Sequence, residues 1–213
     1  MKGAIQMSNL ENYMKQQAIF CEQNDSISKN LYSEYGVKRG LRDEKGQGVL
    51  TGLTNISDIK AFEYHDGVKS PCDGELSYRG YNIKDLVTGS KGKRFVFEEG
   101  AYLLLFGELP TDTQLMEFQG RLSDCMELPT NFTRDVIMKA PTSDIMGSMT
   151  RSILTLGSYD KEKESLEIPN VLRQSMQLIA VFPMLAVYAY HAYCHYEKNE
   201  SMYIHRPEKD LSI

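Results

Sequence analysis

The feature that most restricts how this 213-residue chain can fold is an apolar stretch within residues 169–195. It opens with Pro169, a residue suited to the first turn of a helix, and it is apolar nearly all round. A helix with that pattern has to be buried on more than one side. Its most apolar run, residues 179–190, is too short for an ordinary bilayer span. The sequence therefore predicts a long buried helix and no membrane partner.

Helical patterns also fill the chain between residue 95 and this stretch. Residues 97–106 are strongly apolar and are followed by Gly107 and Pro110, which are typical of a helix end. Thr111 and Gln114 have the spacing of a capping box, which predicts a helix after Pro110. The apolar residues expected on the inner face of that helix are Leu115, Phe118, Leu122 and Met126.

Two further helices are expected before residue 169. Thr130 is a candidate cap for a helix that includes Ile137. Thr142 or Ser143 is expected to start a helix over residues 144–156, where apolar residues recur at helical spacing.

The first third of the chain is polar and is interrupted by turn signals. Ser8 can cap a helix that extends to Cys21, and a second short helix is expected to end at Gly36. Residues 39–48 combine charge with glycine and indicate a linker. We accordingly expect two domains, a helical segment with its linker over residues 1–47 and a larger domain over 48–213.

Short strands are expected near residues 49–81. Turn signals follow one another there at Asp66-Gly67, Asp73-Gly74 and Arg79-Gly80. Asn82 can then cap a short helix. The predicted fold class is mainly α, a multi-helical domain with a small β-hairpin region.

Charge and cysteine usage narrow the possible functions. The chain has 24 Lys and Arg against 29 Asp and Glu, a net charge of −5, which argues against broad nucleic-acid binding. Its four cysteines form no C-x-x-C pair, so zinc-ribbon and thioredoxin-type motifs are excluded. The first ten residues have no apolar core of a secretory signal. These features favour free thiols and a cytoplasmic location.

The residues that could carry chemistry are few. His191 and His195 lie four apart on the predicted long helix and could supply two metal ligands, but no third ligand is evident. We interpret them as polar tips at a helix end and predict no metal. His65 beside Asp66 could be a tuned base, and the hairpin-turn interpretation is favoured because no nucleophile accompanies it. His205 is similarly isolated.

Two other segments have a functional and a structural interpretation. Residues 89–94 are glycine-rich and basic and could cradle a phosphate, although they do not match the P-loop pattern, and a solvated connector is favoured. Residues 78–81, Tyr-Arg-Gly-Tyr, could stack a ligand on their rings. A packed hairpin with a snorkelling arginine is the favoured interpretation.

Two long segments together resemble the N-terminal half of citrate synthase. Residues 74–86, GELSYRGYNIKDL, are similar to the family's Gly-x-Leu-x-Tyr-Arg-Gly-Tyr-x-Ile-x-x-Leu segment. Residues 97–111, FEEGAYLLLFGELPT, resemble the next family segment almost residue for residue. Two long motifs in the right order and spacing are a specific signal.

This resemblance implies an almost entirely helical fold, of which the chain would supply the first part of a large domain. It implies a homodimer, with residues 144–156 and 169–195 resembling the family's interface helices. The implied activity is an acyltransferase of the tricarboxylic acid cycle that condenses acetyl-CoA with oxaloacetate to citrate and CoA. Acetyl-CoA would be a substrate, and no cofactor would be bound permanently.

The resemblance gives this chain no catalytic residue. The family's catalytic His and Asp motifs lie in its C-terminal half beside glycines, and this chain contains no His-Gly, Gly-His or Val-Asp pair. We therefore predict no catalytic and no metal residue and leave cofactor-binding residues unassigned. Residues 210–213 look like the start of a helix, so we expect a truncated chain that is inactive alone.

Two alternatives stay open at the level of sequence. One is a 2-methylcitrate synthase, which uses propionyl-CoA. The other is a non-catalytic helical interaction or regulatory protein derived from the family.

Overall fold

The computed structural model describes residues 13–14, 17–19, 23, 28, 30–38, 40–43, 45–49, 51–89 and 91–213. They divide into two units, Met1–Thr54 and Asn55–Ile213. In the first unit, α2 spans Asn30–Glu34 and is followed by Gly36 at φ +63°, so the second short helix is present. The helix predicted from Ser8 lies largely outside the described residues, and the domain boundary predicted after residue 47 stays a prediction.

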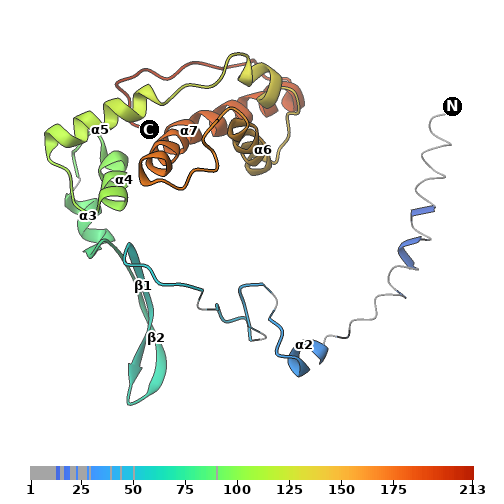
Figure 1. Ribbon diagram of the computed structural model, residues 1–213, viewed down its shortest axis with the longest axis vertical. Coiled ribbons are helices and arrows are strands. Elements are labelled where there is room, and N and C mark those ends of the chain that lie inside the picture. The colour runs from blue at the N-terminus through green and yellow to red at the C-terminus, as the bar shows by residue number, and fades with distance from the viewer. Residues whose placement is uncertain are drawn as a thin grey trace. The chain divides into compact units, whose positions relative to one another are not determined.

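The second unit begins with a three-stranded antiparallel sheet in the order β1-β2-β3. Its strands are β1 (Ser57–His65), β2 (Val68–Tyr78) and β3 (Tyr81–Asn82), and Figure 1 shows the two long ones as an extended ribbon. Asp66 and Gly67 both have positive φ (51° and 79°), as do Arg79 and Gly80 (49° and 86°). Two consecutive positive φ values are the pattern of tight hairpin turns. Both predicted turns are therefore confirmed.

The third predicted turn, at Asp73-Gly74, is wrong. These residues lie inside β2, where the pairing register with β1 shifts between Lys60 and Phe62. Lys60 pairs with Glu75, and Phe62 pairs with Pro71, so the extra residues of β2 form a bulge. A glycine within a strand marks bulges as well as turns, which is why its sequence signal is ambiguous.

The three helices after the sheet begin where the sequence predicts, but the third ends at Asp124, before Met126, which the prediction placed on it. They are α3 (Ile83–Gly89), α4 (Val96–Phe106) and α5 (Asp112–Asp124). Gly107 ends α4 at φ +88°. The capping box is formed: the backbone N–H of Gln114 donates to Thr111 Oγ1 at 3.3 Å, and the Thr111 N–H donates to Gln114 Oε1 at 2.9 Å.

The next two helices depart from prediction at their starts. The segment expected to begin at Thr130 is a short π-helical turn, η1 (Thr133–Ile137), without a side-chain cap. In α6 (Ile145–Gly157) the cap is neither Thr142 nor Ser143 but Asp144, which accepts from the Gly147 N–H at 2.9 Å. A Cβ at position 147 would overlap the Asp144 carboxylate, so the glycine makes room for this cap.

The long predicted helix is α7 (Ile168–Lys198), which continues through Pro183. It supplies six of the eight residues of the first core cluster, and η1 and the residue before it supply the others. The members of this first core cluster are Phe132, Ile137, Val181, Met184, Leu185, Tyr188, Ala189 and Ala192. A second core cluster joins α5 to α7 through Phe118, Leu122 and Ala180. The predicted inner face of α5 is thus confirmed for Leu115, Phe118 and Leu122, whereas Met126 lies beyond the end of the helix and packs, partly buried, against both clusters.

Only one side of α7 is buried within the chain. Phe182 is 42% exposed and Val187 is 50% exposed, although both are large and apolar. By length and composition alone α7 could also cross a membrane, but that test is passed by core helices too. The prediction of burial on more than one side is therefore not met within the described residues, where α7 is buried on the side that packs against α5, α6 and η1.

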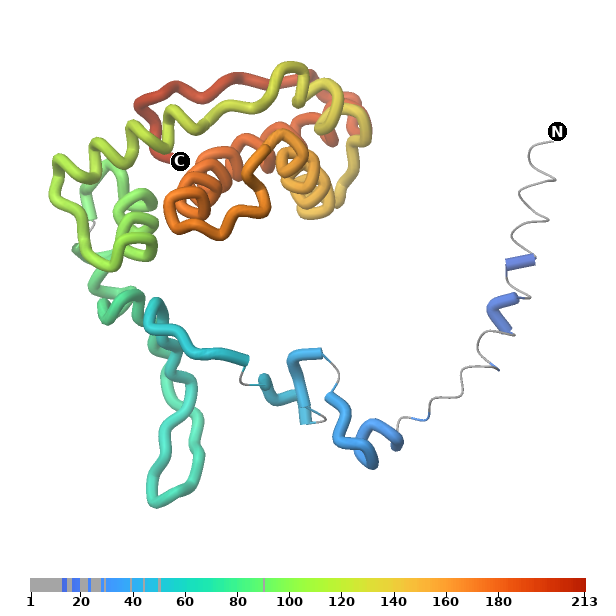
Figure 2. The backbone as a smooth tube through the Cα atoms, in the orientation of Figure 1, coloured from blue at the N-terminus to red at the C-terminus, as the bar shows by residue number. Residues whose placement is uncertain are grey.

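The end of the chain returns along the helices. Figure 2 shows the last residues running back beside the segment that leaves α5. Arg206 Nη2 lies 2.6 Å from Glu127 Oε1, and Lys209 Nζ lies 3.0 Å from Asp124 Oδ1. These contacts tie residues about 80 positions apart.

Candidate functional site

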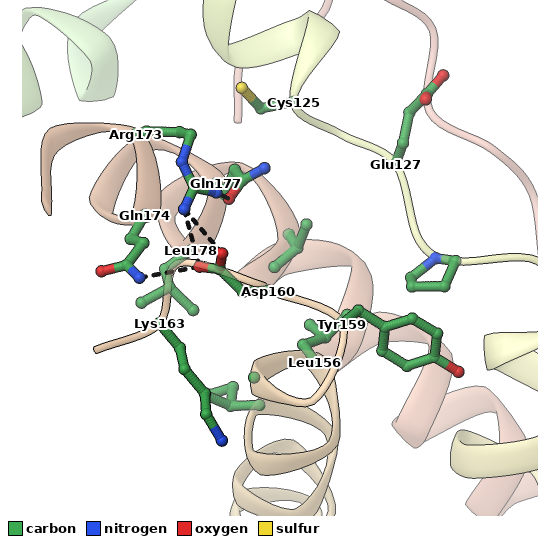
Figure 3. A pocket seen from close by; sticks show the side chains of 14 residues that line it. Cys125, Glu127, Leu156, Tyr159, Asp160, Lys163, Arg173, Gln174, Gln177 and Leu178 are labelled. Carbon is green, nitrogen blue, oxygen red and sulfur yellow. Dashed lines mark hydrogen bonds and ion pairs between the residues drawn. The ribbon is translucent and has the colours of Figure 1, made fainter. Parts of the chain in front are cut away.

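A cavity of about 380 Å³ opens between the loop after α5, the end of α6 and the first half of α7. Apolar side chains from α6 and α7, among them Ile153, Leu156 and Val181, form part of its wall. Asp160 and Lys163 come from the loop after α6, and Arg173 comes from α7 (Figure 3). An apolar wall with a few converging polar groups is typical of small-molecule sites.

Asp160 organises the polar side of this cavity. Arg173 Nη2 donates to both of its carboxylate oxygens at 2.9 Å, and Gln174 Nε2 donates to Oδ2 at 2.8 Å. The backbone N–H of Glu162 donates to Oδ1 at 3.0 Å. The hydrogen bond from Gln174, followed by those from Glu162 and Arg173, lowers the pKa of Asp160. Asp160 therefore stays ionised and fixes the loop to α7.

Arg173 is held in place from its other side. Its Nε donates to Asn170 Oδ1 at 3.0 Å. Its Nη1 donates to Gln177 Oε1 at 3.0 Å (Figure 3). Asn170 in turn donates to the backbone oxygens of Glu162 and Ser165 at 2.8 and 2.9 Å. The positive charge of Arg173 is thus paired with the Asp160 carboxylate of the same chain.

Cys125 also lines the cavity, but it is not activated. Burial, with a smaller contribution from the neighbouring Asp124 carboxylate, raises the pKa of the thiol. A nucleophilic cysteine needs the opposite shift, and no histidine lines this cavity. The arrangement can bind and orient a ligand, but it does not form a nucleophile–base pair.

His191 and His195 both lie in the last turns of α7, where each has its own partners. His191 packs against the rings of Tyr190 and Tyr203, with centroids 5.8 and 6.1 Å away. His195 Nδ1 lies 2.8 Å from the Glu200 backbone oxygen, in the turn that ends α7. Within the described part of the chain, no group of three or more His, Cys, Asp or Glu side chains could hold a metal ion. Their interpretation as polar groups at a helix end fits these contacts.

The other histidines also serve structural roles. His65 is at the tip of the hairpin, where Nε2 lies 3.0 Å from Glu63 Oε1, and both side chains are well exposed. The backbone oxygen of His205 accepts a hydrogen bond from the Tyr188 hydroxyl at 3.0 Å. Neither histidine meets a partner suited to nucleophilic catalysis in these contacts.

Two basic residues of the connector after α3, Lys93 and Arg94, form ion pairs with carboxylates of this chain. Lys93 Nζ lies 2.6 Å from Glu99 Oε1, and Arg94 Nη2 donates to the Asp210 side chain and backbone at 3.1 and 2.7 Å. These two cations are therefore engaged within the chain, which supports the connector interpretation over a phosphate cradle.

The arginine of the Tyr-Arg-Gly-Tyr turn does not snorkel to solvent as expected. Arg79 Nη2 donates to the Leu104 backbone oxygen at 2.9 Å, in the last turn of α4, where carbonyls lack helical partners. Its Nε is buried and has no hydrogen-bond partner among the residues that the structure describes. The turn thereby joins the sheet to α4, and it is not arranged as a stacking site.

A buried carboxylate was missed by sequence reasoning. Glu98 on α4 is completely buried, and its two oxygens accept from the Ser212 hydroxyl and the Ile213 N–H at 2.9 and 2.7 Å. From the sequence, Glu98 and Glu99 in the first turn of an apolar helix suggest only a favourable interaction with the helix dipole. Ser212 and Ile213 lie more than 110 residues along the chain from Glu98, so no local sequence pattern predicts these contacts.

Comparison with known proteins places this arrangement in a family. The family described as "Citrate synthase, C-terminal domain" matches residues 41–213. A citrate synthase of Saccharolobus solfataricus is 30% identical over 154 residues, which are 72% of this chain and 35% of that protein. A 2-methylcitrate synthase of Shewanella oneidensis is 34% identical over 116 residues, 54% of this chain and 28% of that protein.

Solved structures agree with the sequence relatives. The citrate synthase of Pyrobaculum aerophilum has a TM-score of 0.63 at 25% identity, covering 80% of this chain and 39% of that one. The Thermoplasma acidophilum enzyme, solved as a ternary complex with carboxymethyl coenzyme A and oxaloacetate, has a TM-score of 0.57 at 17% identity and shares the fold. It covers 74% of this chain and 36% of its own.

The chain spans about a third of the length of the relatives it matches. The family match extends over most of the chain and includes both segments, 74–86 and 97–111, that carry the resemblance in the sequence. The helical fold is the one expected from that resemblance, and the small antiparallel sheet is the one expected from the turn signals near residues 49–81. The chain belongs to the citrate synthase family.

Proposed function

We propose that this chain is part of an acyltransferase that condenses acetyl-CoA with oxaloacetate to citrate and CoA. The family match over residues 41–213 carries the proposal. A structural relative bound to a CoA derivative and oxaloacetate supports this substrate class, with both molecules as substrates rather than permanent cofactors.

The role of the chain in that reaction is structural. None of its cavity-lining residues forms a nucleophile–base pair, and its histidines are engaged in helix-end and turn contacts. We propose that the catalytic residues lie outside this third of the family's length. On that proposal the chain contributes a helical scaffold and is inactive alone.

The proposed assembly is a cytoplasmic homodimer through α6 and α7. Large apolar side chains are exposed on both helices, including Met146 and Leu154 at 72% and 73% and Val187 at 50%. Monomeric soluble proteins rarely expose large contiguous apolar patches, so a second copy is the partner we propose for this face. The net charge of −5 gives no support to a nucleic-acid partner.

The test uses the protein as its source cells make it. An antibody against residues 41–213 captures the protein, its intact mass is determined, and thiol release is followed with acetyl-CoA and oxaloacetate. We expect oxaloacetate-dependent thiol release from the captured protein and none above background from the 213-residue chain alone. A captured protein without this activity toward any acyl-CoA would contradict the proposal.

A 2-methylcitrate synthase is the second candidate because one such relative is 34% identical to this chain. The same assay with propionyl-CoA separates the two candidates. A higher kcat/KM with acetyl-CoA supports citrate synthase, and a higher kcat/KM with propionyl-CoA supports the second candidate.

A further inference from the structure

The strand β1 is the open edge of the three-stranded sheet. In the described part of the chain it pairs along one side only, with β2, because the strand order is β1-β2-β3. An open edge presents a row of N–H and C=O groups that can pair with a strand of another chain. Proteins usually protect such an edge with proline, a bulge or a covering element.

The other edge of the sheet carries these protections, and β1 does not. The outer side of β2 has Pro71 and the bulge between the pairs of Lys60 and Phe62, and β3 pairs with its last two residues. By contrast, β1 is nine residues long and contains neither proline nor glycine. Of the two edges, β1 is therefore the one that can accept a further strand.

The strand β1 also exposes large apolar side chains on both of its faces. Phe62 and Tyr64 share one face and are 50% and 69% exposed, and Ile59 on the opposite face is also exposed. None of the nine residues is buried. A hairpin of two strands is marginally stable in water, and a further strand would cover part of this apolar surface.

The two-residue turn after His65 determines which backbone groups of β1 point outward. Both turn residues have positive φ, so the flanking pair, His65 with Val68, is the hydrogen-bonded pair that closes the hairpin. The direction of the backbone groups alternates along a strand. The N–H and C=O groups of Lys60, Phe62 and Tyr64 therefore point away from β2.

We propose that β1 pairs antiparallel with β1 of a second copy of this chain, with Phe62 opposite Phe62 at the centre. Two copies that pair through the same strand are related by a two-fold axis, so one residue has to oppose itself. A centre at Lys60 or Glu63 would place like charges directly opposite each other, which is destabilising. A centre at Ala61 would place Ile59 opposite Glu63.

The register centred on Phe62 brings complementary groups together. It places two aromatic rings opposite each other and Lys60 of each copy opposite Tyr64 of the other, where an ammonium group over a ring is favourable. The same kind of contact occurs within the hairpin, where Lys69 Nζ lies 4.0 Å from the centre of the Phe62 ring. The outward backbone groups of these residues meet in the same register, so side chains and main chain favour one alignment.

This contact is separate from the interface proposed for α6 and α7, and it does not depend on the proposed activity. One pair of strands is small beside the roughly 1,200–2,000 Å² that stable protein interfaces bury. We therefore expect weak association, which a covalent cross-link traps and which the mass at micromolar concentration does not report.

Cysteine cross-linking tests the pairing in the protein as its source cells make it. Directly opposed, hydrogen-bonded residues have Cα atoms about 5.5 Å apart, which suits a disulfide, so Phe62→Cys should form an intermolecular disulfide under mild oxidation. Lys60→Cys is the matched control on the same edge, because its two copies would lie four residues apart, about 13 Å along the strand. We expect the Phe62→Cys dimer to form at least about tenfold faster, since the control distance is too long for a disulfide.

A mixing experiment keeps Phe62 in place. Lys60→Cys and Tyr64→Cys oppose each other across the two copies, so an equimolar mixture should give at least about tenfold more mixed disulfide dimer than either variant gives of its own dimer. The wild type measures the background from its native cysteines. Equal cross-linking of Phe62→Cys and Lys60→Cys would overturn the register. The absence of both the Phe62→Cys dimer and the mixed dimer above that background would overturn the pairing.

Discussion

The hairpin β1–β2 and the long helix α7 stabilise themselves by different means. No residue of β1 or β2 is buried, and large apolar residues such as Ile59 are 73% exposed. The hairpin relies on its main-chain ladder, on the tight turn at Asp66-Gly67 and on Arg79, which follows β2 and reaches α4. By contrast α7 has nine buried residues and contributes to both core clusters.

This contrast shows which parts of the sequence determine the structure of each region. The hairpin is specified by local turn chemistry, so its turns can be read from pairs such as Asp66-Gly67. The helix is specified by what packs on it, from elements distant in the chain. Substitutions should therefore act globally in α7 and locally in the hairpin.

The largest expected effect is from truncating a side chain in the α7 core. Leu185 is 1% exposed, and Leu185→Ala should lower the free energy of unfolding by roughly 2–5 kcal/mol because it leaves a cavity. The matched truncation Ile59→Ala in the hairpin should change it by less than about 0.5 kcal/mol. Urea unfolding followed by circular dichroism measures both. Equal losses would show that the hairpin is packed as tightly as the core.

The next effect concerns Arg79, whose side chain ties the end of β2 to α4. Arg79→Ala removes the hydrogen bond to the Leu104 carbonyl and should weaken attachment of the sheet to α4 by about 1–3 kcal/mol. Amide exchange should rise in residues 77–82 and stay unchanged in α7. Arg79→Gly relieves the positive φ of 49° but loses the same bond, so it should show the same pattern to a smaller degree. If the amides of residues 77–82 exchange as slowly in both variants as in the wild type, Arg79 does not attach the sheet to α4.

A smaller effect is expected within the hairpin alone. Gly67 has φ +79°, so Gly67→Ala should destabilise the turn by about 1 kcal/mol. Gly74 has no positive φ and no atom within 4 Å of an added Cβ, so Gly74→Ala is the matched control and should have almost no effect. Nuclear magnetic resonance shifts of β1 and β2 report the hairpin population. A larger loss in Gly74→Ala would mean that the bulge, not the turn, specifies the hairpin.

The smallest effect is a pH dependence at the cavity. The folded-state pKa of Asp160 is lowered, chiefly by the hydrogen bond from Gln174. Its contribution to stability is thus complete above the ordinary carboxyl pKa of about 4 and is lost as pH falls through the lowered folded-state value. Asp160→Asn should reduce the stability difference between pH 6 and pH 3. Identical pH profiles for Asp160→Asn and the wild type would contradict this assignment.

Much of the fold could be predicted because its signals are local. The Thr111–Gln114 capping box, the end of α4 at Gly107 and the extent of α7 are all confirmed. The cap of α6 was misassigned because Thr142, Ser143 and Asp144 are all good caps, and only the backbone geometry selects Asp144.

The contacts that could not be predicted are those between distant segments. Nothing near Glu98 indicates that Ser212 and Ile213 will be its partners, and nothing near Arg79 indicates Leu104. The network of Asp160 with Arg173 and Gln174 likewise depends on how the loop after α6 folds back onto α7. Residue patterns fix periodicity and caps, but such contacts arise only when the helices pack.

We propose that α7 faces the chain's own core on one side and a second copy of the chain on the other. Sedimentation of the wild type and of Val187→Asp tests it, because Val187 is half exposed on the outer side, whereas Leu185 is inside the core. We expect the wild type to sediment at twice 24.3 kDa and the variant at 24.3 kDa, with an unchanged helical circular dichroism spectrum. A wild type that sediments as a monomer, or a Val187→Asp variant that stays dimeric, would contradict the claim.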